Sequence, residues 1–174
     1  MTATTENLTV VTLVRLRRQG LIEEIKKSGV WLKLIEDGGI SASSAAVVPD
    51  TGIDICMGIG GSTEGIITAA ALRCLGGAMQ ARFWPVSRYQ VETLNSLGID
   101  DIEVVLKTED MAGHGVLVAV TAVTSGRFLH GVAARSDGTW TETMVMCSHC
   151  SKISLVKTIH RQGEGQPTPS LWML

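Results

Sequence analysis

The stretch GIGGSTEG, residues 58–65, contains the residue types best suited to bind a ligand. Gly58, Gly60 and Gly61 allow a backbone to approach a ligand closely. A helix that begins after them would offer free N–H groups and the positive end of its dipole, which together favour an anion such as a phosphate. A dinucleotide fingerprint would need a glycine where Thr63 stands, and the chain lacks the Gly-Lys-Ser/Thr run of a P-loop.

Glu64 lies in the first turn of this predicted helix and has two interpretations. Acidic residues are common there because they complement the helix dipole, an effect of about 1 kcal/mol or less. Alternatively, the carboxylate and a bound phosphate share a divalent cation, which would turn a repulsive pair into a bridged one. Mg²⁺ or Mn²⁺ would suit such an all-oxygen site.

Two further groups of polar residues follow predicted strands. Arg15 and Arg17 come after the first strand, and Asp37-Gly38-Gly39 comes after the second. In open α/β sheets the carboxyl ends of the strands form the ligand-binding edge, and guanidinium groups match phosphate oxygens. The arginines could equally belong to a solvated helix start.

The elements that position these residues follow from two alternating hydrophobic periods. Strands are predicted at 8–14, 30–36 and 52–58, with the third buried on both faces, and helices at 17–29, 40–48 and 62–77. This strand-helix alternation predicts a parallel sheet. In the helix over 62–77 we expect an apolar core of Ile66, Ile67, Ala70, Leu72 and Leu75.

Beyond a further helix at 87–99 and a short strand with a helical turn at 100–113, the period changes to two. Strands are predicted at 115–123, 128–135, 139–148 and 151–160. The expected fold class is therefore α/β, with a parallel sheet of βαβ units extended by antiparallel strands. Residues 1–160 are expected to form one domain, followed by a Gly/Pro-rich tail at 161–174.

Composition narrows the classes of function. The 174 residues carry 15 basic and 17 acidic side chains in a mixed arrangement, which gives no footprint for nucleic acid. No segment has the roughly 20 apolar residues of a membrane span, and no secretory signal is evident, so no membrane partner and a cytoplasmic location are expected. The four cysteines are expected to be reduced thiols.

The sequence CSHC, with Cys147 and Cys150, allows a zinc or a redox interpretation. Structural zinc needs four ligands, and a second Cys pair is lacking, although His149 and His160 are nearby in the sequence. The motif by itself is a weak signal.

The segment GIDICMGIGGSTEGIITAAALRCLGGAMQARFWP, residues 52–85, closely resembles the class II (GlpX-type) fructose-1,6-bisphosphatases. Residues 9–25, LIEDGG at 34–39 and TAVTSGRFLHGV at 121–132 extend this similarity. The resemblance implies a sugar-phosphatase fold with part of the family fold, its N-terminal half, missing. It also implies Mn²⁺- or Mg²⁺-dependent hydrolysis of the 1-phosphate of fructose 1,6-bisphosphate in gluconeogenesis and glycerol metabolism, and in some members of sedoheptulose 1,7-bisphosphate.

The resemblance also implies roles for individual residues. Glu64 corresponds to a metal ligand, Gly58 and Gly60 to the phosphate loop, and the substrate contacts are Arg15, Arg17, Asp37, Gly38 and Gly61. The chain departs from the family pattern at Leu16 and Gly39, where a proline and a second aspartate are usual.

Because the family's N-terminal half supplies most acidic metal ligands, we expect the chain alone to be a poor phosphatase. It would then act with a separate chain that provides this half, or bind a sugar phosphate without hydrolysing it. A homo-oligomer is a further expectation, because an apolar face would remain exposed.

Overall fold

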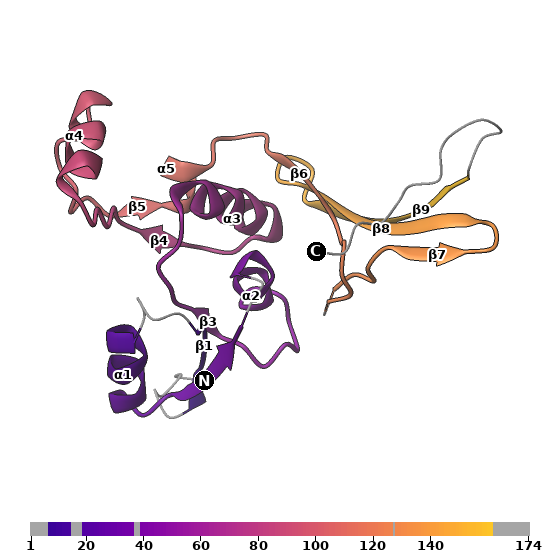
Figure 1. Cartoon of the computed structure of the whole chain (residues 1–174), viewed down its shortest axis with the longest axis horizontal. Coiled ribbons are helices and arrows are strands. Elements are labelled where there is room, and N and C mark those ends of the chain that lie inside the picture. The colour runs from indigo at the N-terminus through magenta and orange to yellow at the C-terminus, as the bar shows by residue number, and fades with distance from the viewer. Residues whose placement is uncertain (1–6, 15–18, 37–38, 127, 162–174) are drawn as a thin grey trace.

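The computed structural model describes residues 7–14, 19–36, 39–126 and 128–161. It contains three small sheets arranged around one helix, α3 (Ser62–Leu75) (Figure 1). A parallel sheet is formed by the N-terminal part of the chain, a four-stranded antiparallel sheet by the C-terminal part, and a two-stranded ribbon lies between them in sequence. The expected α/β class, with a parallel sheet and antiparallel strands, is confirmed.

The parallel sheet has the order β2-β1-β3, formed by β1 (Thr9–Leu13), β2 (Trp31–Ile35) and β3 (Ile55–Cys56). The helices α1 (Gln19–Lys27) and α2 (Gly39–Ala45) lie in its connections, as the βαβ pattern predicts. Both helices end before their predicted ends at 29 and 48.

The core of this part lies between α2 and the parallel sheet. Val11 at the centre of β1 packs with Ala42 and Ala45 of α2 and with Ile53 before β3. Burying these apolar side chains is what holds α2 on the sheet. The central strand β1 is deeply buried. In contrast, Trp31 of β2 is 70% exposed.

The prediction that the strand over 52–58 is buried on both faces is wrong. Ladder pairing is confined to Ile55 and Cys56, and Ile55 and Met57 are each 39% exposed. The strand lies at the edge of the sheet, so one flank has no neighbouring strand within the described residues. An apolar run indicates that a strand is suited to burial, but it cannot show whether a covering layer is present.

Helix α3 ends at Gly76, whose φ of 75° places it in the left-handed region that favours glycine. It lies next to α2, α5 (Thr108–Met111) and the strands β6 (Leu117–Thr121) and β8 (Gly138–Cys147). The helix therefore connects the parallel sheet to the antiparallel one, as its central position in Figure 1 shows.

The predicted apolar core of α3 is only partly correct. Leu72 is buried, and Ala70 and Leu75 are half-buried. In contrast, Ile66 and Ile67 in the second turn are 52% and 43% exposed. Their exposure has a simple cause, because within the described residues no element covers that end of the helix.

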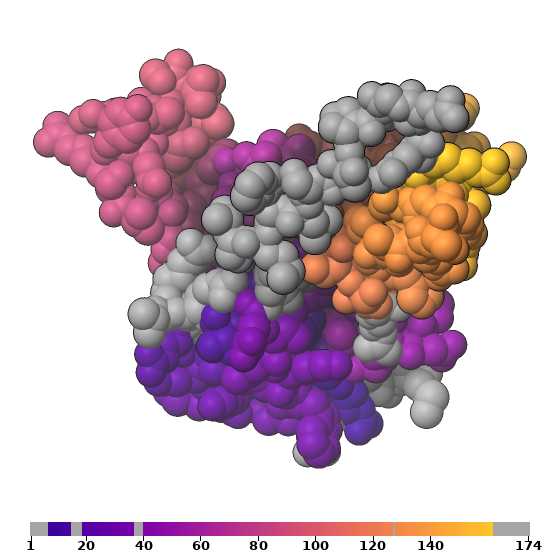
Figure 2. Space-filling view, turned by 45° about the vertical axis from the view of Figure 1, so that its right-hand side comes forward, coloured from indigo at the N-terminus to yellow at the C-terminus, as the bar shows by residue number. Residues whose placement is uncertain are grey.

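The strands β4 (Gln80–Ala81) and β5 (Leu106–Lys107) pair as a ribbon, and the segment that connects them contains α4 (Arg88–Ser96). Helix α4 has no buried residue. In the space-filling view this segment projects from the body of the molecule (Figure 2). It carries the exposed apolar side chains Trp84, Val86, Tyr89 and Leu97.

In the antiparallel sheet, β8 pairs along its length with β9 (Lys152–His160), and on its other side with β6 and β7 (Ala133–Arg135). These strands form a sheet of their own, so the prediction that they extend the parallel sheet is wrong. The strand predicted over 128–135 is also shorter than expected. Two-residue alternation predicts a strand but does not identify its partner.

One face of the antiparallel sheet packs on α3. Met146 is buried against Ala71 and Cys74, with Met144 and Val118 beside them. Leu155 of β9 pairs with Met144 and therefore lies on the same face, yet it is 66% exposed. Helix α3 covers the β6 and β8 part of this face and leaves the β9 edge open.

Candidate functional site

The carboxyl ends of all three parallel strands lie at one edge of the sheet, as the sequence predicts. The last ladder interactions there are donated by the N–H groups of Val14, to Ile35 O at 2.8 Å, and Met57, to Val11 O at 3.0 Å. The connections after β1, β2 and β3 therefore begin side by side. This edge is the expected ligand-binding edge of an α/β sheet.

The residues predicted to contact substrate from the first two connections lie outside the described residues. These are Arg15, Arg17, Asp37 and Gly38. Their roles therefore stay predictions.

The glycine loop, residues 58–61, joins β3 to α3 and is described in full. Gly58, Gly60 and Gly61 are exposed. Gly61 is the N-cap of α3 with extended backbone, φ −71° and ψ 151°, so glycine is not required there for a left-handed conformation. At Gly60 a Cβ atom would lie 3.2 Å from Glu64 Oε2, so a larger residue there would require the carboxylate to shift slightly.

Glu64 is exposed and turns back to cap its own helix. The Gly61 N–H donates a hydrogen bond to Glu64 Oε2 at 3.1 Å. The carboxylate therefore satisfies one backbone donor that the helix start leaves free, and its charge complements the helix dipole. The capping interpretation of Glu64 is confirmed, while its metal-binding role remains a prediction.

The described residues cannot complete a metal site around Glu64. Within them, no group of three or more His, Cys, Asp or Glu side chains could hold a metal ion. Mg²⁺ favours six oxygen ligands, of which proteins usually supply one or two carboxylates. Glu64 fits one such position, since its hydrogen bond uses Oε2 and no partner of Oε1 is found among the described residues.

A polar cluster on the antiparallel sheet was missed by sequence reasoning. Glu142 of β8 accepts hydrogen bonds at 2.9 Å from the His130 backbone N–H and from Lys157 Nζ, and His130 Nδ1 lies at the same distance. The His130 N–H, the Lys157 ammonium and the His130 ring lower the pKa of Glu142 from 4.5 to about 2. The pairing of Glu142 with Lys157 follows from the predicted hairpin, but the contribution of His130 requires the folded loop.

This cluster lines a pocket of about 200 Å³ with Phe128, Leu155 and Val156. Both carboxylate oxygens of Glu142 are occupied by donors, which suits a group that holds a loop on a sheet. A carboxylate with so low a pKa is a weak base at neutral pH. We therefore assign the cluster a structural role.

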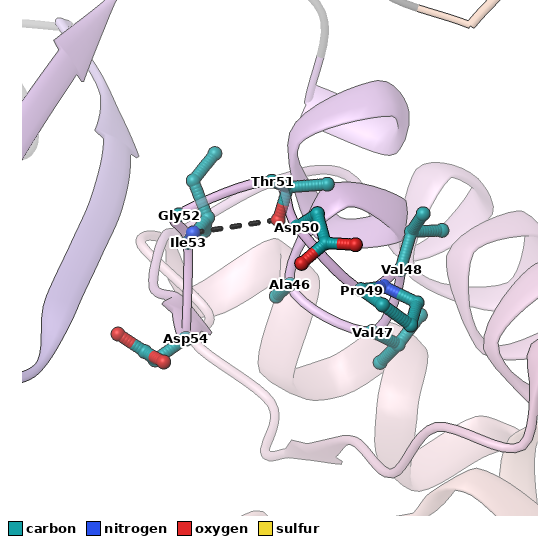
Figure 3. Close-up of a pocket in the computed structure, with 9 residues that line it drawn as sticks. All are labelled: Ala46, Val47, Val48, Pro49, Asp50, Thr51, Gly52, Ile53 and Asp54. Carbon is teal, nitrogen blue, oxygen red and sulfur yellow. Dashed lines mark hydrogen bonds between the residues drawn. The ribbon is translucent and has the colours of Figure 1, made fainter.

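Another pocket lies at the opposite edge of the parallel sheet, before β3 (Figure 3). It has a volume of about 270 Å³ and is lined by the continuous segment 46–54. Two carboxylates, Asp50 and Asp54, line it and no cationic side chain does. Because these charges would repel a phosphate, the pocket does not fit the ligand that the glycine loop predicts.

The four cysteines are free thiols, as expected. Cys147 is the last residue of β8, and Cys150 follows in the turn. Within the described residues, neither belongs to a group of side chains that could bind zinc. Among the same residues, no helix is long and apolar enough to cross a membrane.

The family model and the relatives that match this chain all point to one protein family. The family model described as bacterial fructose-1,6-bisphosphatase, glpX-encoded, matches residues 1–160. Proteins from Synechococcus sp. strains JA-2-3B'a(2-13) and JA-3-3Ab, both named D-fructose 1,6-bisphosphatase class 2/sedoheptulose 1,7-bisphosphatase, are 39% identical to this chain. A protein of the same name from Gloeobacter violaceus is 35% identical.

The chain spans about half the length of the curated relatives it matches. The alignments with the two Synechococcus proteins cover 92% of this chain and 50% of each relative. The alignment with the Gloeobacter protein covers 89% of this chain and 49% of that relative.

Proposed function

Because the chain belongs to the family of bacterial glpX-encoded fructose-1,6-bisphosphatases, we propose that it provides the phosphate-binding part of a metal-dependent sugar bisphosphatase. The observation that carries this proposal is the exposed glycine loop, which joins the carboxyl end of β3 to the first turn of α3 within the family match. A substrate phosphate at this point would face the backbone N–H groups of the helix start.

Each residue of the predicted site then has a distinct task. Gly58, Gly60 and Gly61 let the phosphate approach the backbone, and Arg15 and Arg17 bind its oxygens with planar, permanently charged groups. Asp37 and Gly38 orient the sugar. Glu64 would hold Mg²⁺ or Mn²⁺, and the bound cation would supply charge neutralisation and Lewis acidity at the phosphate.

The remaining metal ligands are proposed to come from the portion of the relatives that this chain does not cover. A single carboxylate leaves most of an octahedral shell to water and phosphate. The exposed Ile66 and Ile67 next to Glu64 give that portion an apolar surface on which to pack. We propose fructose 1,6-bisphosphate and sedoheptulose 1,7-bisphosphate as substrates, following the names of the relatives.

The deciding experiment measures phosphate release from fructose 1,6-bisphosphate with Mn²⁺ or Mg²⁺. The chain is assayed alone and after mixing with the uncovered half of the Synechococcus relative. Activity is expected only in the mixture. Sugar-phosphate binding by calorimetry without hydrolysis in any mixture would instead identify the chain as a binding module and contradict the proposal.

Two substitutions separate the capping and metal roles of Glu64. Glu64→Gln keeps an oxygen that can accept the Gly61 N–H, so it should retain thermal stability yet lose activity by at least about 100-fold. Glu64→Ala should lose both activity and about 1 kcal/mol of stability. Glu92→Gln, which removes an exposed carboxylate in an ion pair with Arg88, is the matched control. Full activity in Glu64→Gln would exclude a metal-binding role.

A further inference from the structure

The turn between β8 and β9 places two thiols next to each other. Cys147 is the last residue of β8 and is half-buried, whereas Cys150 lies in the turn and is exposed. From this arrangement we propose that Cys147 and Cys150 form a reversible dithiol–disulfide site that exchanges with low-molecular-weight disulfides such as oxidised glutathione. This inference is independent of the proposed phosphatase function.

The backbone of the turn already brings the two cysteines together. Cys147 pairs with Lys152 across the hairpin, so only the four residues 148–151 form the connection. Ser151 has a φ of 51°, which tightens the reversal of the chain. The Cys150 thiol and backbone N–H both reach the Cys147 sulfur across this reversal, and a short sulfur-to-sulfur approach is what a disulfide requires.

The two sulfur atoms also differ in reactivity. Hydrogen bonds from the Cys150 thiol, the Cys150 backbone N–H and the His149 backbone N–H lower the pKa of Cys147, as does the nearby Lys152 charge. Because the thiolate is the nucleophile in thiol–disulfide exchange, Cys147 is the attacking residue. Cys150 is the exposed partner that completes the reaction.

The exchange proceeds in two balanced steps. The Cys147 thiolate attacks one sulfur of oxidised glutathione, which forms a mixed disulfide and releases one glutathione thiolate. The Cys150 thiol then loses its proton and attacks the Cys147 sulfur, which forms the Cys147–Cys150 bond and releases the second glutathione. The protein loses two hydrogens, and one oxidised glutathione becomes two reduced ones.

The other cysteines provide internal controls. Cys74 is buried, and burial together with the neighbouring Cys147 and Cys150 raises its pKa. Its thiol contacts the Val116 carbonyl at 3.6 Å, the same carbonyl that accepts the Ser148 N–H of the turn. Cys56 is half-buried beside the Ser43 hydroxyl. Exchange should therefore be restricted to the C-x-x-C pair.

The test titrates the folded chain with buffers of increasing oxidised-to-reduced glutathione ratio. Free thiols are then alkylated, and the products are located by peptide mass spectrometry. The expected product is an intramolecular Cys147–Cys150 disulfide with Cys56 and Cys74 alkylated. A persistent glutathione adduct, a disulfide that includes Cys74 or Cys56, or a fully reduced chain in oxidised glutathione alone would overturn the proposal.

Single substitutions assign the two steps. Cys150→Ser should trap the mixed disulfide on Cys147, because the resolving thiol is gone. Cys147→Ser should slow adduct formation by about tenfold or more, because it removes the thiol whose pKa the turn lowers. Cys56→Ser should behave as the unsubstituted chain, and a circular dichroism spectrum confirms that each variant is folded. An equal rate in Cys147→Ser would contradict the assigned nucleophile.

Discussion

The two ends of α3 have similar apolar composition but different surroundings. At the C-terminal end, Ala71 and Cys74 are buried against Met146 of the antiparallel sheet. At the N-terminal end, Ile66 and Ile67 are exposed beside the glycine loop. The difference teaches that packing within the described residues holds the helix at one end, while the end that carries the predicted phosphate site leaves apolar side chains exposed.

The largest effect should come from Met146, at the packed end. Met146→Ala removes most of a buried side chain and leaves a cavity between α3 and β8, so we expect a loss of about 2–5 kcal/mol of unfolding free energy. Urea denaturation measures this loss. A loss below about 1 kcal/mol would mean that the α3–β8 contact does not hold the two elements together.

A second substitution tests the contact just beyond the packed end. Gly77 lies after the C-cap, and a Cβ atom there would overlap the Val47 side chain and lie 3.2 Å from Leu72 Cδ2. Gly77→Ala should therefore destabilise the chain by about 1–3 kcal/mol through overpacking. The double substitution Gly77→Ala with Val47→Ala supplies the space and should recover most of the loss. Absence of recovery in urea denaturation would contradict a steric cause.

The pH dependence of the unfolding free energy should distinguish the contribution of apolar packing at Met146 from that of the polar cluster further along β8. The pKa of Glu142 is lowered to about 2, so its ionised form stabilises the folded state. This contribution is complete above about pH 4.5 and is lost as the pH falls toward 2. Glu142→Gln should flatten the stability profile in that window, whereas Met146→Ala should lower the whole profile evenly. Parallel profiles for Glu142→Gln and the unsubstituted chain would contradict the assignment.

The smallest effect is expected at the exposed end. Ile66→Ala should change the unfolding free energy of the chain by about 0.5 kcal/mol or less, because the side chain is already about half in water. The same substitution should weaken association with the uncovered half of a relative by about tenfold, which analytical ultracentrifugation can measure. The exposed Tyr89→Ala, on the projecting α4 segment, is the comparison variant. Equal association of the Ile66→Ala and unsubstituted chains would show that this surface is not the contact.

Local sequence patterns predicted the helices and strands well. They predicted the burial of individual residues less well. The βαβ alternation predicted the parallel pairing of β1 with β2 and β3, and the short gap between the strands predicted at 139–148 and 151–160 indicated the β8–β9 pairing. Both depend on neighbours in sequence. The exposure of Ile66 and the separation of the two sheets depend on which distant layer is present, and a hydrophobic period carries no information on that.

The candidate site shows the same limit. The positions of the glycine loop and of Glu64 at the helix start follow from glycine and capping preferences, and the structure confirms them. The His130–Glu142 contact was missed because it joins a loop to a strand. Its formation requires a fold that brings the two segments together, so no spacing in the sequence identifies it.

The position of α3 between the two sheets also has a mechanical consequence. Its 14 residues form a rod about 21 Å long, with the methionine contact at Ala71 and Cys74 and the glycine loop at its N-terminal end. A tilt of about 5° about Ala71 would displace the loop by about 1 Å, because roughly ten residues at about 1.5 Å each separate this contact from Gly61. We therefore expect α3 to work as a lever, so that small changes in the methionine packing alter the position of the glycine loop.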